Sequence, residues 1–143
     1  MSRHRVLLVR EWDEQTSGSG CCGRLGGDAV RALVEPAADP YAHTRRDMER
    51  MGAVYRALRE QFGDELDLTV VDPRNTVWLV PTVWRDARRR GLAVLAALRQ
   101  ANAATRACAL VCDGMVLCTD ASPAEAVSAV SADIAAMRTV ERS

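Results

Sequence analysis

The residues best suited to chemistry are two adjacent cysteines, Cys21 and Cys22, in the glycine-rich run Gly18-Ser19-Gly20-Cys21-Cys22-Gly23-Arg24. The thiolate is the form of cysteine that attacks electrophiles and binds metals, and a nearby positive charge such as that of Arg24 favours it. Adjacent thiols close a disulfide only through a strained ring, but both can bind one soft ion without any chain closure. The pattern therefore indicates either thiol redox chemistry at Cys21 or Cys22 or binding of a soft metal or metalloid ion.

Three further cysteines, Cys108, Cys112 and Cys118, follow in the C-terminal part of the chain. Cys108 and Cys112 are expected on one strand about 13 Å apart, at ~3.3 Å per residue, which is too far for a disulfide. A two-residue turn at Asp113-Gly114 predicts that Cys118 lies opposite Ala109 as a core residue, on the other face from Cys108 and Cys112. For Cys112, at the tip of the hairpin, partial exposure is compatible with the sequence, and no role is evident.

Length and composition predict one globular domain over residues 1–143, with 48% hydrophobic and 27% charged residues. Nineteen basic residues balance nineteen acidic ones, so net charge gives no reason to expect nucleic acid or an anionic membrane as partner. The apolar run Val6-Leu7-Leu8-Val9 is too short for a signal peptide, and no run has the length of a membrane span. We therefore expect a cytoplasmic protein, in a compartment that keeps thiols reduced.

The chain is predicted to fold in the order β-α-β-α-β-β-α, an α/β arrangement. Short apolar runs indicate strands, apolar residues at spacings of three and four indicate helices, and Asp-Gly between apolar runs indicates a tight hairpin. Proline fits the first turn of a helix, and a serine three residues before a glutamate forms a capping box. The expected ranges are strands 6–9 and 66–71, helices 44–62 and 81–102 (the latter divided at Gly91), hairpin strands 107–112 and 115–119, and a final helix from Ser122.

This order resembles that of the thioredoxin-like proteins, and the segment Leu110-Val111-Cys112-Asp113-Gly114-Met115-Val116-Leu117 resembles their third and fourth strands. The resemblance implies a single thioredoxin-like domain over residues 1–143, with a mixed four-stranded sheet flanked by helices. It also implies reactive cysteines after the first strand, where Cys21 and Cys22 stand. The chain departs from the family pattern because Arg24 replaces the second thiol of Cys-x-x-Cys, and no proline stands near Arg106, where a cis-proline would be expected.

The arsenical metallochaperones are thioredoxin-like proteins to which the adjacent pair is similar, and they use a third cysteine near the pair. Counting back from the Asp113-Gly114 turn places Cys108 near the start of the third strand, which in this family lies beside the cysteine loop. The resemblance thus implies Cys21, Cys22 and Cys108 as metal ligands.

Three functions follow. The first is a thiol-disulfide oxidoreductase using Cys21, Cys22 and Arg24, with a protein thiol as partner. The second is a soft-metal or metalloid binding protein using Cys21, Cys22 and Cys108, with a metal-handling protein as partner; an iron–sulfur cluster is a further alternative. The third is a non-catalytic interaction domain that uses a region of tryptophans and arginines around Trp84. A homodimer is compatible with all three, and neither nucleic acid nor a membrane is expected as a partner.

Overall fold

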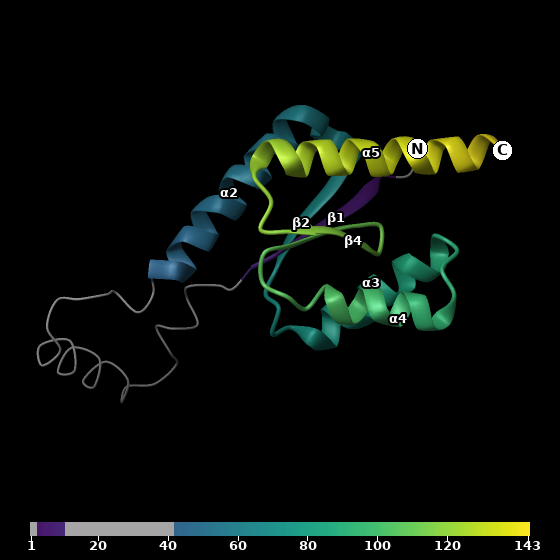
Figure 1. Ribbon diagram of the computed structural model, residues 1–143, viewed down its shortest axis with the longest axis horizontal. Coiled ribbons are helices and arrows are strands. Elements are labelled where there is room, and N and C mark those ends of the chain that lie inside the picture. Colours follow the sequence, from purple (N-terminus) through teal and green to yellow (C-terminus); the bar gives the residue numbers. More distant parts are fainter. Residues whose placement is uncertain (1–2, 11–41) are drawn as a thin grey trace, which may run out of the picture.

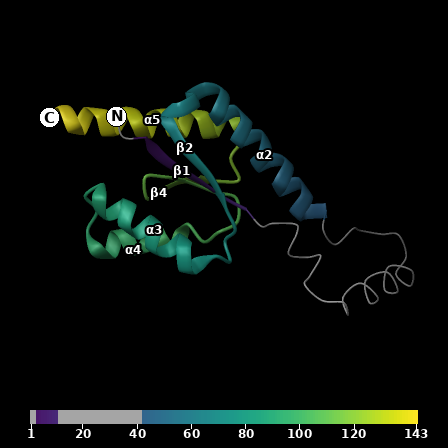
Figure 2. The same ribbon diagram turned by 180° about the vertical axis from the view of Figure 1, so that it is seen from behind.

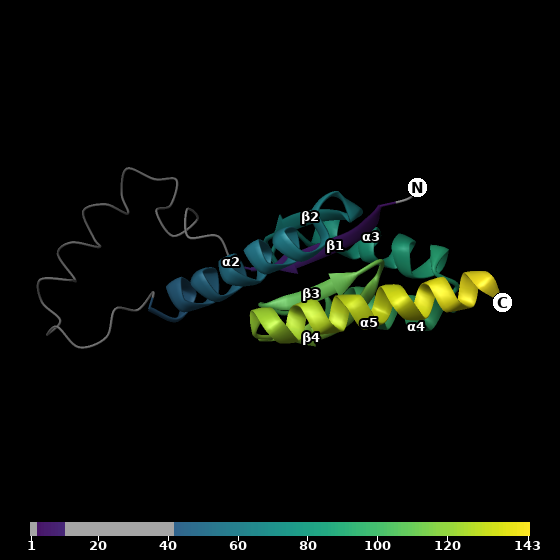
Figure 3. The ribbon, with the colours of Figure 1, turned by 90° about the horizontal axis from the view of Figure 1, so that it is seen from above.

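The computed structural model describes residues 3–10 and 42–143, which form three layers (Figure 1). A sheet lies in the middle. Helices α2 (Ala42–Phe62) and α5 (Pro123–Arg142) cover one face, and α3 (Thr76–Arg89) and α4 (Val94–Ala103) cover the other. The view from behind shows the same separation (Figure 2), and the view from above shows α2 and α5 running over the strands (Figure 3).

The sheet has four strands in the order β2-β1-β3-β4. The first two, β1 (His4–Val9) and β2 (Leu66–Val71), are parallel. The other two, β3 (Ala109–Cys112) and β4 (Met115–Thr119), form a hairpin in which β3 lies antiparallel to β1. The predicted α/β class with a mixed four-stranded sheet flanked by helices is therefore confirmed.

The central strand β1 is buried on both faces, as its continuous apolar sequence predicts. Successive side chains of a strand point to opposite faces, so Val6 and Leu8 pack under α2 and α5 while Leu7 and Val9 pack under α3 and α4. All four are at most 1% exposed. Two hydrophobic cores therefore share β1 as their common wall.

Helix α3 begins five residues earlier than predicted, so Pro81 lies inside it and not in its first turn. A proline inside a helix removes one hydrogen bond, which weakens the local preference. The residues around it, Leu79 and Val83, are fully buried against the sheet. Their burial offsets the lost hydrogen bond, which explains why the proline rule failed here. The helix ends at Arg89, before Gly91, so the division predicted at that glycine is confirmed.

The hairpin turn has the geometry that Asp-Gly predicts, with φ of 45° at Asp113 and 83° at Gly114. A bulge shifts the pairing between Leu110 and Val111 by one residue. Cys118 therefore pairs with Leu110 and packs against the core under α2 and α5. The prediction that Cys118 faces away from Cys112 is wrong, because a bulge moves every later side chain to the other face.

The last helix, α5, starts with the predicted capping box. Ser122 Oγ accepts from the backbone N–H of Glu125, and the Glu125 carboxylate accepts from the N–H of Ser122, both at 3.2 Å. Among the described residues, no helix combines the length and the apolar character needed to cross a membrane.

Candidate functional site

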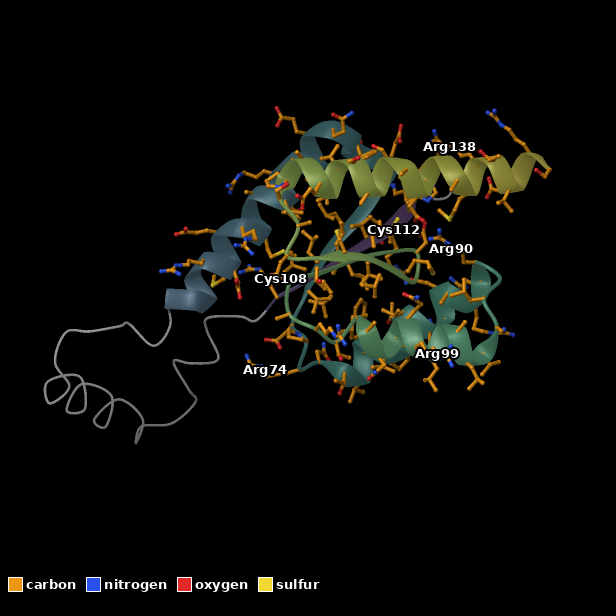
Figure 4. The ribbon with its side chains drawn as sticks, viewed as in Figure 1. Arg74, Arg90, Arg99, Cys108, Cys112 and Arg138 are labelled. Carbon is orange, nitrogen blue, oxygen red and sulfur yellow. The ribbon has the colours of Figure 1, made fainter. Side chains whose placement is uncertain are left out.

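Cys108 directly precedes β3, at the end of the sheet where β1 ends. Its backbone N–H donates to the carbonyl of Val9 at 2.7 Å, and its φ of 60° lies in the left-handed region. The residue is only 2% exposed. Figure 4 shows it between the sheet and α2. This position, at the start of β3, agrees with the count back from the hairpin turn.

Two carboxylates lie beside this thiol. Cys108 Sγ and one carboxylate oxygen each of Asp47 and Asp120 lie within 4.8 Å of one another. Asp47 comes from the second turn of α2, and Asp120 follows β4 with a φ of 55°. The backbone N–H of Asp120 donates to the carbonyl of Cys108 at 3.1 Å, which fixes the two segments against each other. We call Asp47, Cys108 and Asp120 the thiol–carboxylate cluster.

The three residues of the cluster differ in solvent exposure: Cys108 is buried, Asp47 is half-buried and Asp120 is exposed. Burial raises the pKa of the Cys108 thiol to about 12, and the negative charges of Asp47 and Asp120 add to this rise. Arg50 opposes it from an exposed position, 3.5 Å from Asp120 through Nη1. In the absence of a bound cation, Cys108 is therefore a neutral thiol and not a nucleophilic thiolate.

The other predicted site residues, Cys21, Cys22 and Arg24, lie outside the described residues, as does their whole glycine-rich run. The structure does define where that segment is attached. The backbone N–H of Arg10 donates to the carbonyl of Val71 at 2.9 Å, at the same end of the sheet as Cys108. The chain enters the described part again at Ala42, one turn of α2 before Asp47. Both attachment points thus flank the thiol–carboxylate cluster.

Sequence reasoning did not predict a role for Asp47 or Asp120. A signal for Asp47 was present, because it continues the stripe of Met51, Val54 and Leu58, the buried face of α2, at spacings of four and three. A carboxylate in line with a buried stripe faces the core side of its helix. Asp120 offers no such signal, since only the pairing of β3 with β4 brings it to Cys108.

Cys112 is fully buried, so the partial exposure considered for it is not found. Helix α5 covers it. Arg90 links β3 to α5, because it donates to the Cys112 carbonyl at 3.2 Å and forms a bidentate ion pair with Asp133. Burial raises the pKa of the Cys112 thiol. Cys118 is half-buried, and burial raises its pKa too. These two thiols behave as core residues.

A hollow of about 650 Å³ lies at the opposite end of β1, beside His4. The His4 side chain is 21% exposed, and its Nδ1 lies 2.8 Å from Oδ2 of Asp113. Both basic and acidic side chains line the hollow, so it has no strong charge preference. The lining residues are Arg3, His4, Asp64, Glu65, Met137, Arg138 and Glu141.

Comparison with known proteins gives no relative for this chain: no family model matches it, and neither a curated protein nor a solved structure does. Its function must therefore be argued from its own residues.

Proposed function

We propose that this protein binds a thiophilic divalent metal ion of the zinc class at the thiol–carboxylate cluster, with Cys21 or Cys22 completing the ligand set. The observation that carries the proposal is the convergence of Cys108 Sγ with carboxylate oxygens of Asp47 and Asp120 within 4.8 Å. Helix α2 and the two ends of the β3–β4 hairpin contribute one potential ligand each.

The donor set favours one class of ion. Zinc accepts cysteine sulfur and aspartate oxygen together, in a tetrahedral site. Cu(I) prefers soft sulfur ligands, while Mg²⁺ and Ca²⁺ prefer oxygen alone. A mixed set of one sulfur and two oxygens therefore matches Zn(II), or Cd(II) as its softer analogue, better than the metalloids and Cu(I) that the cysteine pair alone indicates.

The electrostatics support the same function. Burial is the main reason why the pKa of Cys108 is raised, and the two carboxylates beside the thiol disfavour the thiolate further. A divalent cation among the three groups reverses that penalty, because it interacts favourably with every negative charge and displaces the thiol proton. The arrangement is poor for an attacking cysteine and suited to a bound cation.

The length of chain between Arg10 and Cys21 allows the Cys21–Cys22 pair to reach the cluster. Cys21 is eleven residue steps beyond Arg10, and an extended chain of eleven steps spans at most about 36–40 Å. Arg10 is attached at the same end of the sheet as Cys108, so this length is ample for the pair to meet the cluster. One sulfur from the pair would bring a zinc ion to four ligands.

The thioredoxin-like fold is also part of the proposal. It is supported by the parallel pairing of β1 with β2, the antiparallel hairpin of β3 and β4 beside β1, and the final helix α5. The redox function of Cys21 and Cys22, with Arg24 supporting a thiolate, stays a prediction. Its test is the pH dependence of alkylation at the pair, where a rate that persists well below pH 8 would indicate a lowered thiol pKa.

The direct test is a competition titration of the reduced, metal-free full chain with Zn(II) in the presence of a chromophoric chelator. The double variant Asp47→Asn/Asp120→Asn retains the size of the side chains and removes their charge. Matched controls are Asp64→Asn, at an exposed acidic position of the 3-10 turn Gly63–Glu65, and Cys118→Ser, at the half-buried thiol of β4.

The expected result is one Zn(II) per chain, with affinity lowered at least about 10–100-fold in the double variant and in Cys108→Ser and unchanged in both controls. Equal affinity in wild type and the Asp47→Asn/Asp120→Asn variant would show that the carboxylates hold no metal. Binding lost only in Cys21→Ser and Cys22→Ser would assign the ion to the pair alone. Either outcome overturns the proposed site.

A further inference from the structure

The outer surface of α3 and α4 carries large apolar side chains in solvent. These helices pack against each other on the sheet face away from α2 and α5 (Figures 1 and 2). We call this surface the α3–α4 face. Its exposed fractions are far above those of a core residue: Val77 87%, Leu95 68%, Val94 52%, Leu98 50%, Trp78 41% and Trp84 37%. Six large exposed apolar side chains gathered on two neighbouring helices indicate an interaction site.

The same face is strongly basic, although the chain as a whole is neutral. Residues 73–107 contain seven of the nineteen basic residues and one of the nineteen acidic ones, Asp86. That carboxylate is buried and bound to Arg5, with Arg5 Nη1 3.2 Å from its Oδ2. Within the two helices themselves, four arginines (Arg85, Arg88, Arg89 and Arg99) stand against this one carboxylate, a net charge of +3.

The arginines of this face are not neutralised within the described part of the chain. Arg85, Arg89 and Arg99 are exposed and form no ion pair there, and Arg88 donates only to the backbone carbonyl of Leu92, at 2.6 Å. Figure 4 shows Arg99 on the side of α4 that faces away from the sheet. By contrast, Arg90, which directly follows α3, is bound to Asp133 of α5. The basic charge of the outer side is thus available to a partner.

Apolar and basic side chains are interleaved on this face. Val77, Trp84 and Arg88 recur at helical spacing on one side of α3, and Arg99 lies next to Leu98 on α4. A helix that lies on a membrane keeps its apolar and charged faces separate, which is not the case here. Tryptophan and arginine mixed in one patch are instead typical of the energetic centre of a protein–protein interface.

We propose that the α3–α4 face binds an acidic amphipathic segment of another protein, one that alternates carboxylates with apolar residues. Its carboxylates would pair with Arg85, Arg88 and Arg99, since guanidinium and carboxylate match in a bidentate geometry. Its apolar residues would cover Trp84 and Leu98. A second copy of this chain in a two-fold arrangement would set arginines against arginines, which is unfavourable. The proposal does not depend on the metal site.

The test uses three fluorescent helical peptides: one with leucine and glutamate at helical spacing, its scrambled form, and the same sequence with lysine in place of glutamate. Binding to the full chain is followed by fluorescence anisotropy and by backbone amide NMR shifts. The variants are the charge reversal Arg85→Glu/Arg88→Glu/Arg99→Glu and Trp84→Ala. Arg56→Glu, at an exposed position on α2, is the matched control.

We expect the glutamate peptide to bind better than its scrambled form by at least about tenfold, with shifted amides confined to α3 and α4. The charge reversal should exchange the preference, so that the lysine peptide binds and the glutamate peptide does not. Binding of the lysine peptide requires a folded variant. This result would therefore show that the glutamate peptide is lost because recognition has changed and not because the variant is unfolded. The proposal would be overturned if the scrambled peptide bound equally well, or if the charge reversal did not exchange the preference. It would also be overturned if this face bound phosphatidylserine vesicles in place of the peptide, or if it mediated dimers.

Discussion

Replacing Gly114 with alanine should destabilise the fold more than a turn substitution normally does. The φ of Gly114 is +83°, and a Cβ built there lies 2.1 Å from the backbone nitrogen and 2.6 Å from the Cα of Ala87 in α3. A positive φ costs a non-glycine residue about 1–2 kcal/mol, and overpacking against atoms that cannot move adds about 1–3 kcal/mol. The expected loss of about 2–5 kcal/mol is a large share of the about 5–15 kcal/mol that stabilises a domain.

Gly63→Ala is the matched control for this substitution. Gly63 also has a positive φ, +53°, but nothing lies within 4 Å of its added Cβ, so only the backbone cost of about 1–2 kcal/mol applies. Urea unfolding of both variants and of wild type gives the comparison, in which Gly114→Ala should lose about 1–3 kcal/mol more than Gly63→Ala. Equal losses would refute the close packing of the hairpin turn on α3.

Three more outcomes follow from the structure. Because burial raises the pKa of the Cys112 thiol, its contribution to stability should be constant below the ordinary thiol pKa near 9 and fall above it, by up to about 1.4 kcal/mol per pH unit; Cys112→Ala should make the loss of stability with pH less steep in urea unfolding at pH 7–11. Ser122→Ala should lower the free energy of unfolding by about 1 kcal/mol, and Ser128→Ala, at an exposed position inside α5, should leave it within about 0.5 kcal/mol; similar losses would contradict the capping box. Asp133→Asn should cost about 3–5 kcal/mol by leaving Arg90 partly buried without its carboxylate, and a thermal melt that matches wild type would exclude that role.

The parts of the fold that the sequence predicts are those decided by local chemistry. The apolar run at Val6, the Asp113-Gly114 turn and the cap at Ser122 each satisfy a rule that needs only a few neighbouring residues. The errors occur where tertiary packing decides. Helix α3 begins before Pro81 because Leu79 is buried against the sheet. The bulge after Leu110 moves Cys118 to the other face of the sheet.

The candidate site divides in the same way. Counting from the turn predicts the position of Cys108, because strand residues advance at a fixed rise. Its neighbours Asp47 and Asp120 are 73 residues apart in sequence and meet only after α2 packs on the sheet and β4 pairs with β3. No local pattern contains that information. The glycine-rich run around Cys21 has no apolar periodicity from which its path could be predicted.

The central claim, that Cys108 ligates a metal ion together with two carboxylates, is tested most directly by Co(II) substitution. Co(II) occupies zinc sites, and each bound thiolate adds sulfur-to-cobalt charge-transfer absorption in the near ultraviolet. We predict this absorption in the reduced wild-type chain, a clear decrease in Cys108→Ser, and no change in Cys118→Ser. A spectrum in Cys108→Ser that equals the wild-type spectrum would contradict the claim.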